Sequence, residues 1–127
     1  MSLPHKMNAS FFPAVPGPCE APVITNVTKD HMTVSWKEPD NDGQSTILGY
    51  IVEKKEIKDV NWTKINRKAM LERSLEVGGL TEGTEYEFRV TALNIAGLGK
   101  PSDPSSGTSA HDPICEYKIT QYVLRCL

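Results

Sequence analysis

The stretch "GLGKPS" at residues 97–102 carries the residue types of a phosphate-binding loop. Such loops place a Gly-Lys-Ser/Thr sequence between a strand and a helix, so that backbone amides and the helix dipole face the phosphates. Here Pro101 separates Lys100 from Ser102, and no helical periodicity follows. The stretch therefore predicts a turn between two strands and not a nucleotide site.

Nucleophilic hydrolysis needs a nucleophile, a base and an orienting group in one place, and a zinc site needs closely spaced cysteines and histidines. The chain has three of each, scattered and without a CxxC pair: His5, His31, His111, Cys19, Cys115 and Cys126. An odd and peripheral set of cysteines is also a poor disulfide framework. We expect no enzymatic activity, no metal and no cofactor.

Basic residues gather in two neighbouring segments, "EKKEIKD" at residues 53–59 and "KINRK" at residues 64–68. Alternating charge is what exposed strands ordinarily carry, so a solvated face is the simpler interpretation. A partner site is the alternative. Its candidate residues are Lys54, Lys55, Lys58, Lys64 and Arg67.

The composition predicts one folded, soluble domain. The chain has 127 residues, 39% of them hydrophobic and 24% charged, and its net charge of -2 gives no general affinity for nucleic acid or for an anionic membrane. No apolar run approaches the roughly 20 residues that span a bilayer. Glycosylation sequons occur at Asn8, Asn26 and Asn61, and they would matter only in a secretory compartment.

The elements that must position these groups are strands. In "LTEGTEYEFRVTALNIAG" at residues 80–97, apolar and polar residues alternate with the period of a strand. Similar patterns predict strands at residues 23–28, 32–37, 48–56, 61–65, 74–77, 85–94 and 99–109. Seven short strands separated by turns indicate an antiparallel sandwich. Its predicted core includes Trp36, Tyr50, Val52, Leu80, Tyr86, Phe88 and Val90.

Several spaced motifs resemble the fibronectin type III domain over about residues 16–112. They are Trp36 in "TVSW", "DGQSTILGYIVEKKE" at residues 42–56, Trp62, and Leu80 followed by Tyr86 in "YEFRVTALNIAGLGKPS". The "PGP" lead-in and the closing "DP" are similar to the repeats of titin and related giant muscle proteins, twitchin and myosin-binding protein C among them.

That resemblance implies an all-β, seven-stranded antiparallel Greek-key sandwich. It also implies a spacer and docking module of a sarcomeric filament protein in the cytoplasm, in the A-band or M-band region. The implied partners are the myosin thick filament and neighbouring modules. A ligand-binding module of an extracellular receptor or adhesion protein is the alternative. In the family's tyrosine corner, the hydroxyl of Tyr86 would meet a main-chain group of residues 79–83.

The two ends of the chain fall outside the resemblance. Residues 1–15 are interpreted as a vector remnant or linker, residues 16–112 as the domain, and residues 113–127 as an atypical tail. In the tail, Tyr117, Ile119 and Val123 alternate with polar neighbours, which predicts an added strand. Because a sandwich has open edges, such a strand could pair with its own molecule or with a neighbour, and self-association is the expected consequence.

Overall fold

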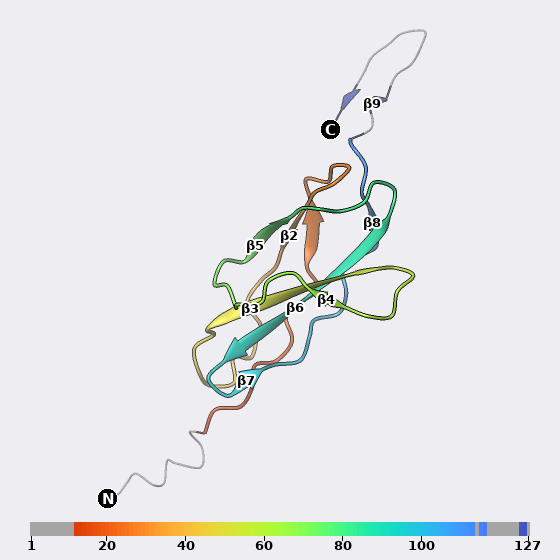
Figure 1. The fold of residues 1–127 in the computed structure, drawn as a ribbon. Helices are drawn as coiled ribbons and strands as arrows, with labels where there is room; N and C mark the ends of the chain where they lie inside the picture. The colour runs from red at the N-terminus through yellow and green to blue at the C-terminus, as the bar shows by residue number, and fades with distance from the viewer. Residues whose placement is uncertain (1–11, 114, 117–124, 127) are drawn as a thin grey trace, which may run out of the picture.

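A computed structural model describes residues 12–113, 115–116 and 125–126. These residues form two antiparallel sheets packed as a sandwich and a separate strand pair in the tail. The predicted all-β fold is confirmed. The lead-in and the segment ending at Pro113 lie at opposite ends of the sandwich (Figure 1). Over the described part of the chain, there is no helix long and apolar enough to cross a membrane.

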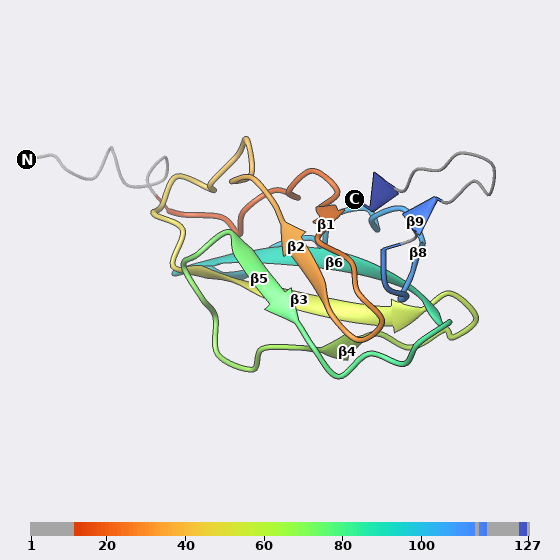
Figure 2. The same cartoon turned by 90° about the horizontal axis from the view of Figure 1, so that it is seen from above.

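The strands divide between the sheets as a Greek key. One sheet has the order β1-β2-β5, formed by β1 (Val23–Thr25), β2 (Met32–Ser35) and β5 (Ser74–Val77). The other has the order β4-β3-β6-β7, formed by β4 (Thr63–Lys64), β3 (Gly49–Glu56), β6 (Glu85–Asn94) and β7 (Gly97–Leu98). β8 (Thr108–Ser109) also pairs with β6. Figure 2 shows β2 and β5 running diagonally across β3 and β6.

The predicted strand at residues 99–109 is interrupted, which corrects the sequence interpretation. Only β7 and β8, near the two ends of this segment, form regular ladder pairs with β6. Between them Pro101 and Pro104 have no N–H to donate. Two buried serines replace the missing ladder bonds, since the hydroxyl of Ser102 accepts from the Val90 amide and that of Ser105 from the Phe88 amide, both over 3.0 Å.

The core lies between the sheets and takes one side of each strand. Trp36, directly after β2, meets Tyr50 of β3 edge to face, with ring centroids 5.7 Å apart. Burying a side chain of this size contributes roughly 1.5 to 3 kcal/mol. The other large buried side chains around this pair are Met32, Val34, Val52, Val77, Leu80, Tyr86, Phe88 and Val90.

The predicted tail strand falls mainly on residues 117–124, which lie outside the described residues. The described part of the tail forms one antiparallel pair, β9 (Cys115–Glu116) with β10 (Arg125–Cys126). These two short strands pair with each other and make a sheet of their own. Among the described residues, therefore, the tail supplies no strand to either sheet of the sandwich.

Candidate functional site

A tryptophan covers a charged patch on the outer face of β3 and β6. The guanidinium carbon of Arg89 lies 4.5 Å from the centroid of the Trp62 ring, and the ammonium of Lys55 lies 5.6 Å from it. Trp62 directly precedes β4, so the short β3–β4 hairpin carries the ring over the sheet. A cation over an indole face contributes about 0.5 to 2 kcal/mol, depending on how far water is excluded.

Each of these two cations also forms an ion pair across the strands. The Arg89 Nε donates to the Glu53 carboxylate over 2.8 Å, and the Lys55 ammonium lies 3.0 Å from the Glu87 carboxylate. In the register of β3 with β6, the two partners of each ion pair lie directly opposite each other. Their side chains are only 13 to 26% exposed. This cluster of four charges and one indole stiffens the outer face.

The five candidate partner residues do not form one surface. Lys55 is held in the ion pair just described. Lys54 pairs in register with Phe88, so it belongs to the opposite side of β3, at the end of the core. Lys58 lies in the loop after β3 and borders a small hollow with Gly83 and Glu85.

Lys64 and Arg67 are brought together. They line an open hollow of about 500 Å³ with Glu53, Trp62 and Thr63. Both cations are exposed, and neither has a carboxylate within ion-pair distance in the described part of the chain. The hollow lies along β4, which is the edge strand of its sheet. This arrangement offers two positive charges outside any ion pair of the described residues, next to Trp62, to the open edge of β4 and to the Glu53 carboxylate that Arg89 already holds.

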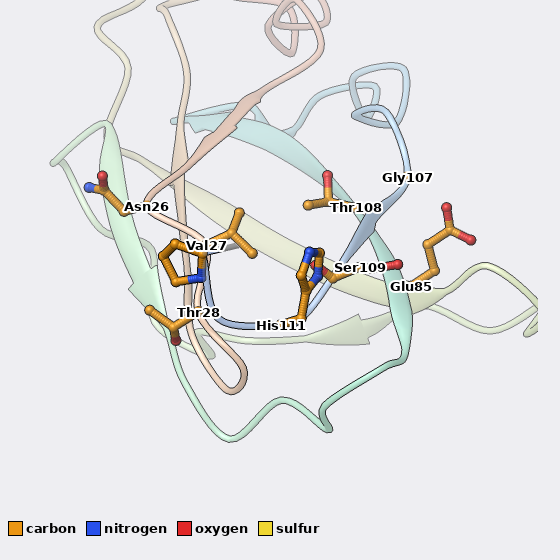
Figure 3. Close-up of a pocket in the computed structure, with 9 residues that line it drawn as sticks. Asn26, Val27, Thr28, Glu85, Gly107, Thr108, Ser109 and His111 are labelled. Carbon is orange, nitrogen blue, oxygen red and sulfur yellow. The ribbon is translucent and has the colours of Figure 1, made fainter. Parts of the chain in front are cut away.

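A hollow of about 820 Å³ lies at the end of the sandwich opposite the lead-in. Figure 3 shows residues 26–28 on one rim, residues 107–109 on the other, and the His111 ring between Val27 and Ser109. The Nδ1 of His111 lies 3.2 Å from the carbonyl oxygen of Ser109. This contact ties the imidazole to its own loop. The described residues contain no cluster of acidic, histidine or cysteine side chains that could hold a metal.

A histidine and an aspartate form a second local pair in the turn between β1 and β2. The Nδ1 of His31 lies 2.7 Å from the Asp30 carboxylate, and both side chains are about half exposed. The hydrogen bond to Asp30 raises the pKa of His31, and the same bond lowers the pKa of Asp30. The pair therefore stabilises the turn.

The lead-in before β1 is bound to the sandwich at the entry end. The Ala14 amide donates to the Gly43 carbonyl over 3.0 Å, and the Gly17 amide donates to the Asn41 carbonyl over 2.8 Å. The chains approach so closely that a Cβ on Gly43 would lie 1.9 Å from the Ala14 oxygen. The side-chain amide of Asn94 completes this contact by donating to the Ala14 carbonyl.

Tyr86 and Asn94 lie on the same inward side of β6 and anchor its two ends. The Tyr86 hydroxyl accepts a hydrogen bond from the Thr81 amide over 2.9 Å, inside the segment that the tyrosine corner implied. Sequence reasoning missed Asn94, although the signal was present. Asn94 continues the alternation of Tyr86, Phe88 and Val90, so a polar amide at an inward position was visible in the pattern.

Asn66 is a second amide that sequence reasoning missed. Its Oδ1 accepts from the Val52 amide over 2.7 Å, and its Nδ2 donates to the Tyr50 carbonyl over 2.8 Å. The Asn66 side chain thereby supplies hydrogen bonds to the edge of β3 beyond the point where β4 ends. No alternation or motif in the "KINRK" segment marks this role.

The sheet topology and the tyrosine corner at Tyr86 define a class of β-sandwich module. Sequence comparison assigns the chain to the same class. The family profile of the fibronectin type III domain matches residues 17–108. The chain belongs to this family.

Relatives of the chain include sarcomeric muscle proteins. Human myomesin-2 is 45% identical over 82 residues, covering 65% of this chain and 6% of myomesin-2. Cardiac-type myosin-binding protein C from Gallus gallus is 41% identical over 91 residues, covering 72% of this chain and 7% of that protein. The chain thus spans less than a tenth of the length of these two relatives.

Solved structures give the same result. The crystal structure of titin domains A168–A170 superposes with a TM-score of 0.75 at 36% identity, covering 79% of this chain and 34% of that one. The similarity to titin and its relatives that the sequence motifs suggested is therefore confirmed.

Proposed function

We propose that this chain is a non-enzymatic structural module of a sarcomeric filament protein, acting as a spacer and as a docking surface for thick-filament partners. The observation that carries the proposal is its membership of the fibronectin type III family together with muscle relatives at 41 to 45% identity. One of these relatives is named for binding myosin. The lead-in is bound at one end of the sandwich, and the chain leaves the sandwich at the opposite end. This arrangement suits a module that separates its neighbours along a filament.

We place the docking surface at the hollow beside β4. Lys64 and Arg67 supply the uncompensated charge, and Trp62 supplies an aromatic edge held in place by Arg89. An extended acidic segment fits these features, because it could pair with the open β4 edge while its carboxylates approach the two cations. Lys55 is excluded from this role, since Glu87 already neutralises it.

Co-sedimentation with myosin filaments tests the docking role. We expect the double variant Lys64→Glu/Arg67→Glu to bind about tenfold more weakly, which corresponds to about 1.4 kcal/mol. The matched control is Lys37→Glu/Lys100→Glu, which makes the same charge change at two exposed positions away from β4. Equal weakening in both variants would show a general charge effect and would reject the β4 surface.

The cellular location follows from the same proposal. We place the parent protein in the sarcomere of the muscle-cell cytoplasm, in the A-band or M-band region. The extracellular alternative makes a contrary prediction, because Asn26 and Asn61 are both exposed and sit in sequons. Glycan found on either residue in native protein would reject the muscle assignment. Immunolocalisation to striations in muscle fibres would support it.

We also propose that the module spans residues 16–112. At the first border, the hydrogen bonds of Ala14 to Gly43 and Asn94 hold the end of the preceding linker against the module. At the second border, the Asp112 carboxylate accepts a hydrogen bond from the Lys29 amide over 3.1 Å.

For the tail beyond Asp112 we retain self-association as a proposal. Sedimentation equilibrium on the full chain and on a chain ending at Asp112 tests it, and two monomers would reject it.

A further inference from the structure

Thr63 lies opposite a lysine at the edge of the second sheet. It is the first residue of β4, and the register of β4 with β3 joins it to Lys54. Side chains of directly opposed residues leave the sheet on the same face, with Cβ atoms about 4.5 to 5.5 Å apart. The two residues also line one small hollow together. An anionic group on Thr63 would therefore meet the ammonium of Lys54.

The same threonine also borders the hollow beside β4. It lines that hollow with Lys64 and Arg67, the two cations that we assign to the docking surface. Thr63 is the one residue that both hollows share. Three of the five basic residues singled out in the sequence thus surround one neutral hydroxyl.

The carboxylates near Thr63 do not cancel these three cations. Glu53 accepts from Arg89 over 2.8 Å and is already neutralised. Glu56 and Asp59 line the first hollow and are the opposing charges there. Outside the ion pairs of the described residues, three cations therefore face two carboxylates, and the surroundings of Thr63 are positive.

The position of Thr63 is accessible to an enzyme. Both residues of β4 are exposed, and the segments on either side, residues 57–62 and 65–69, are irregular. A short edge strand of this kind opens locally at low cost, which frees an extended segment. A protein with an acidic groove would recognise that segment through Lys64, Arg67 and Lys68, because opposite potentials attract.

We propose that Thr63 is a phosphorylation site for a protein kinase with an acidic substrate groove. The Oγ1 of Thr63 attacks the γ-phosphorus of ATP, the bond from that phosphorus to the β–γ bridging oxygen breaks, and ADP leaves. A carboxylate of the kinase takes the hydroxyl proton and passes it to water. One phosphorus–oxygen bond forms and one breaks.

The phosphate acts on the docking surface, and this consequence rests on the proposed function. Phosphothreonine carries a charge of about -1.5 to -2 at neutral pH. It pairs with Lys54 across the strands and offsets most of the charge of Lys64 and Arg67. An acidic segment is then repelled from the open edge of β4. Phosphorylation of Thr63 therefore releases the partner.

Mapping of the phosphate tests the site. The full chain is incubated with Mg-ATP and a kinase that prefers basic residues around its acceptor, the catalytic domain of protein kinase C, and its peptides are sequenced by mass spectrometry. We expect phosphate on Thr63. Thr63→Ala should lose this phosphate, whereas Ser106→Ala, at an exposed serine outside both hollows, should keep it.

A free peptide of residues 57–70 is treated in parallel. A peptide that accepts phosphate while Thr63 of the folded chain does not would show that β4 shields the hydroxyl, and would overturn the proposal. Failure of both substrates would overturn it as well, because the basic residues around Thr63 would then not be recognised.

Titration of the phosphate tests its pairing with Lys54. Phosphorus-31 NMR follows its second ionisation, which has an ordinary pKa of about 6. The pKa should be lower than that in the folded chain and should rise in Lys54→Gln, because a nearby cation favours the dianion. Lys37→Gln, at an exposed lysine outside both hollows, should leave it unchanged. The same pKa in all three chains would overturn the pairing.

Co-sedimentation with myosin filaments tests the consequence. The phosphorylated chain should bind about tenfold more weakly than the unmodified chain, because the added charge opposes an acidic partner. Equal binding of the two forms would overturn the regulatory role. If the unmodified chain does not bind at all, the docking proposal fails, while the mapping and the titration still decide whether Thr63 is a phosphorylation site.

Discussion

The side-chain amide of Asn94 donates a hydrogen bond to the carbonyl of Ala14, which lies 80 residues earlier in the chain, over 2.8 Å. A second bond from the same Nδ2 reaches the Asp42 carbonyl over 2.8 Å, and the Oδ1 accepts from the Ala96 amide. Asn94 is 2% exposed. One buried amide thus joins the lead-in, the loop before β3 and the turn after β6.

Replacing Asn94 with alanine should lower the free energy of unfolding by about 1 to 3 kcal/mol, because buried carbonyls lose their donor. Urea denaturation measures the change. Asn61→Ala is the control, since Asn61 is exposed and such surface changes stay within about 0.5 kcal/mol. Amide exchange at Ala14, whose N–H donates to the Gly43 carbonyl, should rise in the Asn94 variant alone. Equal stability of the two variants would contradict the anchoring role.

The close approach of Gly43 to the lead-in predicts a second difference. Gly43 and Gly79 have similar positive φ values, 73° and 70°, but a Cβ on Gly79 would meet nothing within 4 Å. Gly79→Ala should therefore cost only the left-handed penalty of about 1 to 2 kcal/mol. Gly43→Ala should cost about 2 kcal/mol more, because its Cβ would strike the Ala14 carbonyl. Similar urea midpoints for Gly43→Ala and Gly79→Ala would show that the lead-in can move away from residue 43 without loss of stability.

The two tryptophans should differ in their contribution to stability. Trp36 is 6% exposed and packs on Tyr50 in the core, so Trp36→Ala should cost roughly 3 to 5 kcal/mol. Trp62→Ala removes an outer cover over Arg89 and Lys55 and should cost about 1 to 2 kcal/mol. Chemical denaturation of both variants gives the comparison. Equal losses would refute the distinction between core and cover.

Tyr86→Phe should cost about 1 to 3 kcal/mol and leave the fold intact. The change deletes one buried hydroxyl and leaves the Thr81 amide without its acceptor. Far-ultraviolet circular dichroism should be unchanged while the urea midpoint falls. A variant as stable as the parent would mean that water satisfies the Thr81 amide.

The His31–Asp30 pair predicts a pH dependence with a definite sign. Because the folded pKa of His31 is raised, its contribution to stability is full below about pH 6.5 and is lost as the pH rises through the folded pKa. Because the folded pKa of Asp30 is lowered, its contribution is present above about pH 3.9 and is lost as the pH falls through the lowered pKa.

His31→Gln should therefore lower the urea midpoint at mildly acidic pH and change it less at alkaline pH. His111→Gln is the control, since the Nδ1 of His111 lies near a carbonyl of its own loop and no carboxylate of the described residues pairs with it. The urea midpoints of the two variants should differ only between the lowered pKa of Asp30 and the raised pKa of His31. The same loss at both pH values would assign the effect of His31 to packing and not to charge.

Alternation along the chain was enough to predict most of the sandwich. The strands at residues 74–77 and 85–94 have the predicted bounds, since both faces of each differ clearly in polarity. The predicted strand at residues 99–109 failed because alternation does not record which amides can donate. Pro101 and Pro104 break the ladder there, and the Ser102 and Ser105 hydroxyls restore it through bonds that only folding creates.

The sequence alone determined the fold class and which side chains point inward. Burial of one face of a strand makes apolar and polar residues alternate, and this alternation is visible among neighbouring residues of the chain. Only the tertiary structure decided how the charged side chains are grouped. Five basic residues look alike in sequence, yet cross-strand register neutralises Lys55 with Glu87 and leaves Lys64 beside Arg67. Such pairings depend on alignment between distant segments, which local periodicity does not contain.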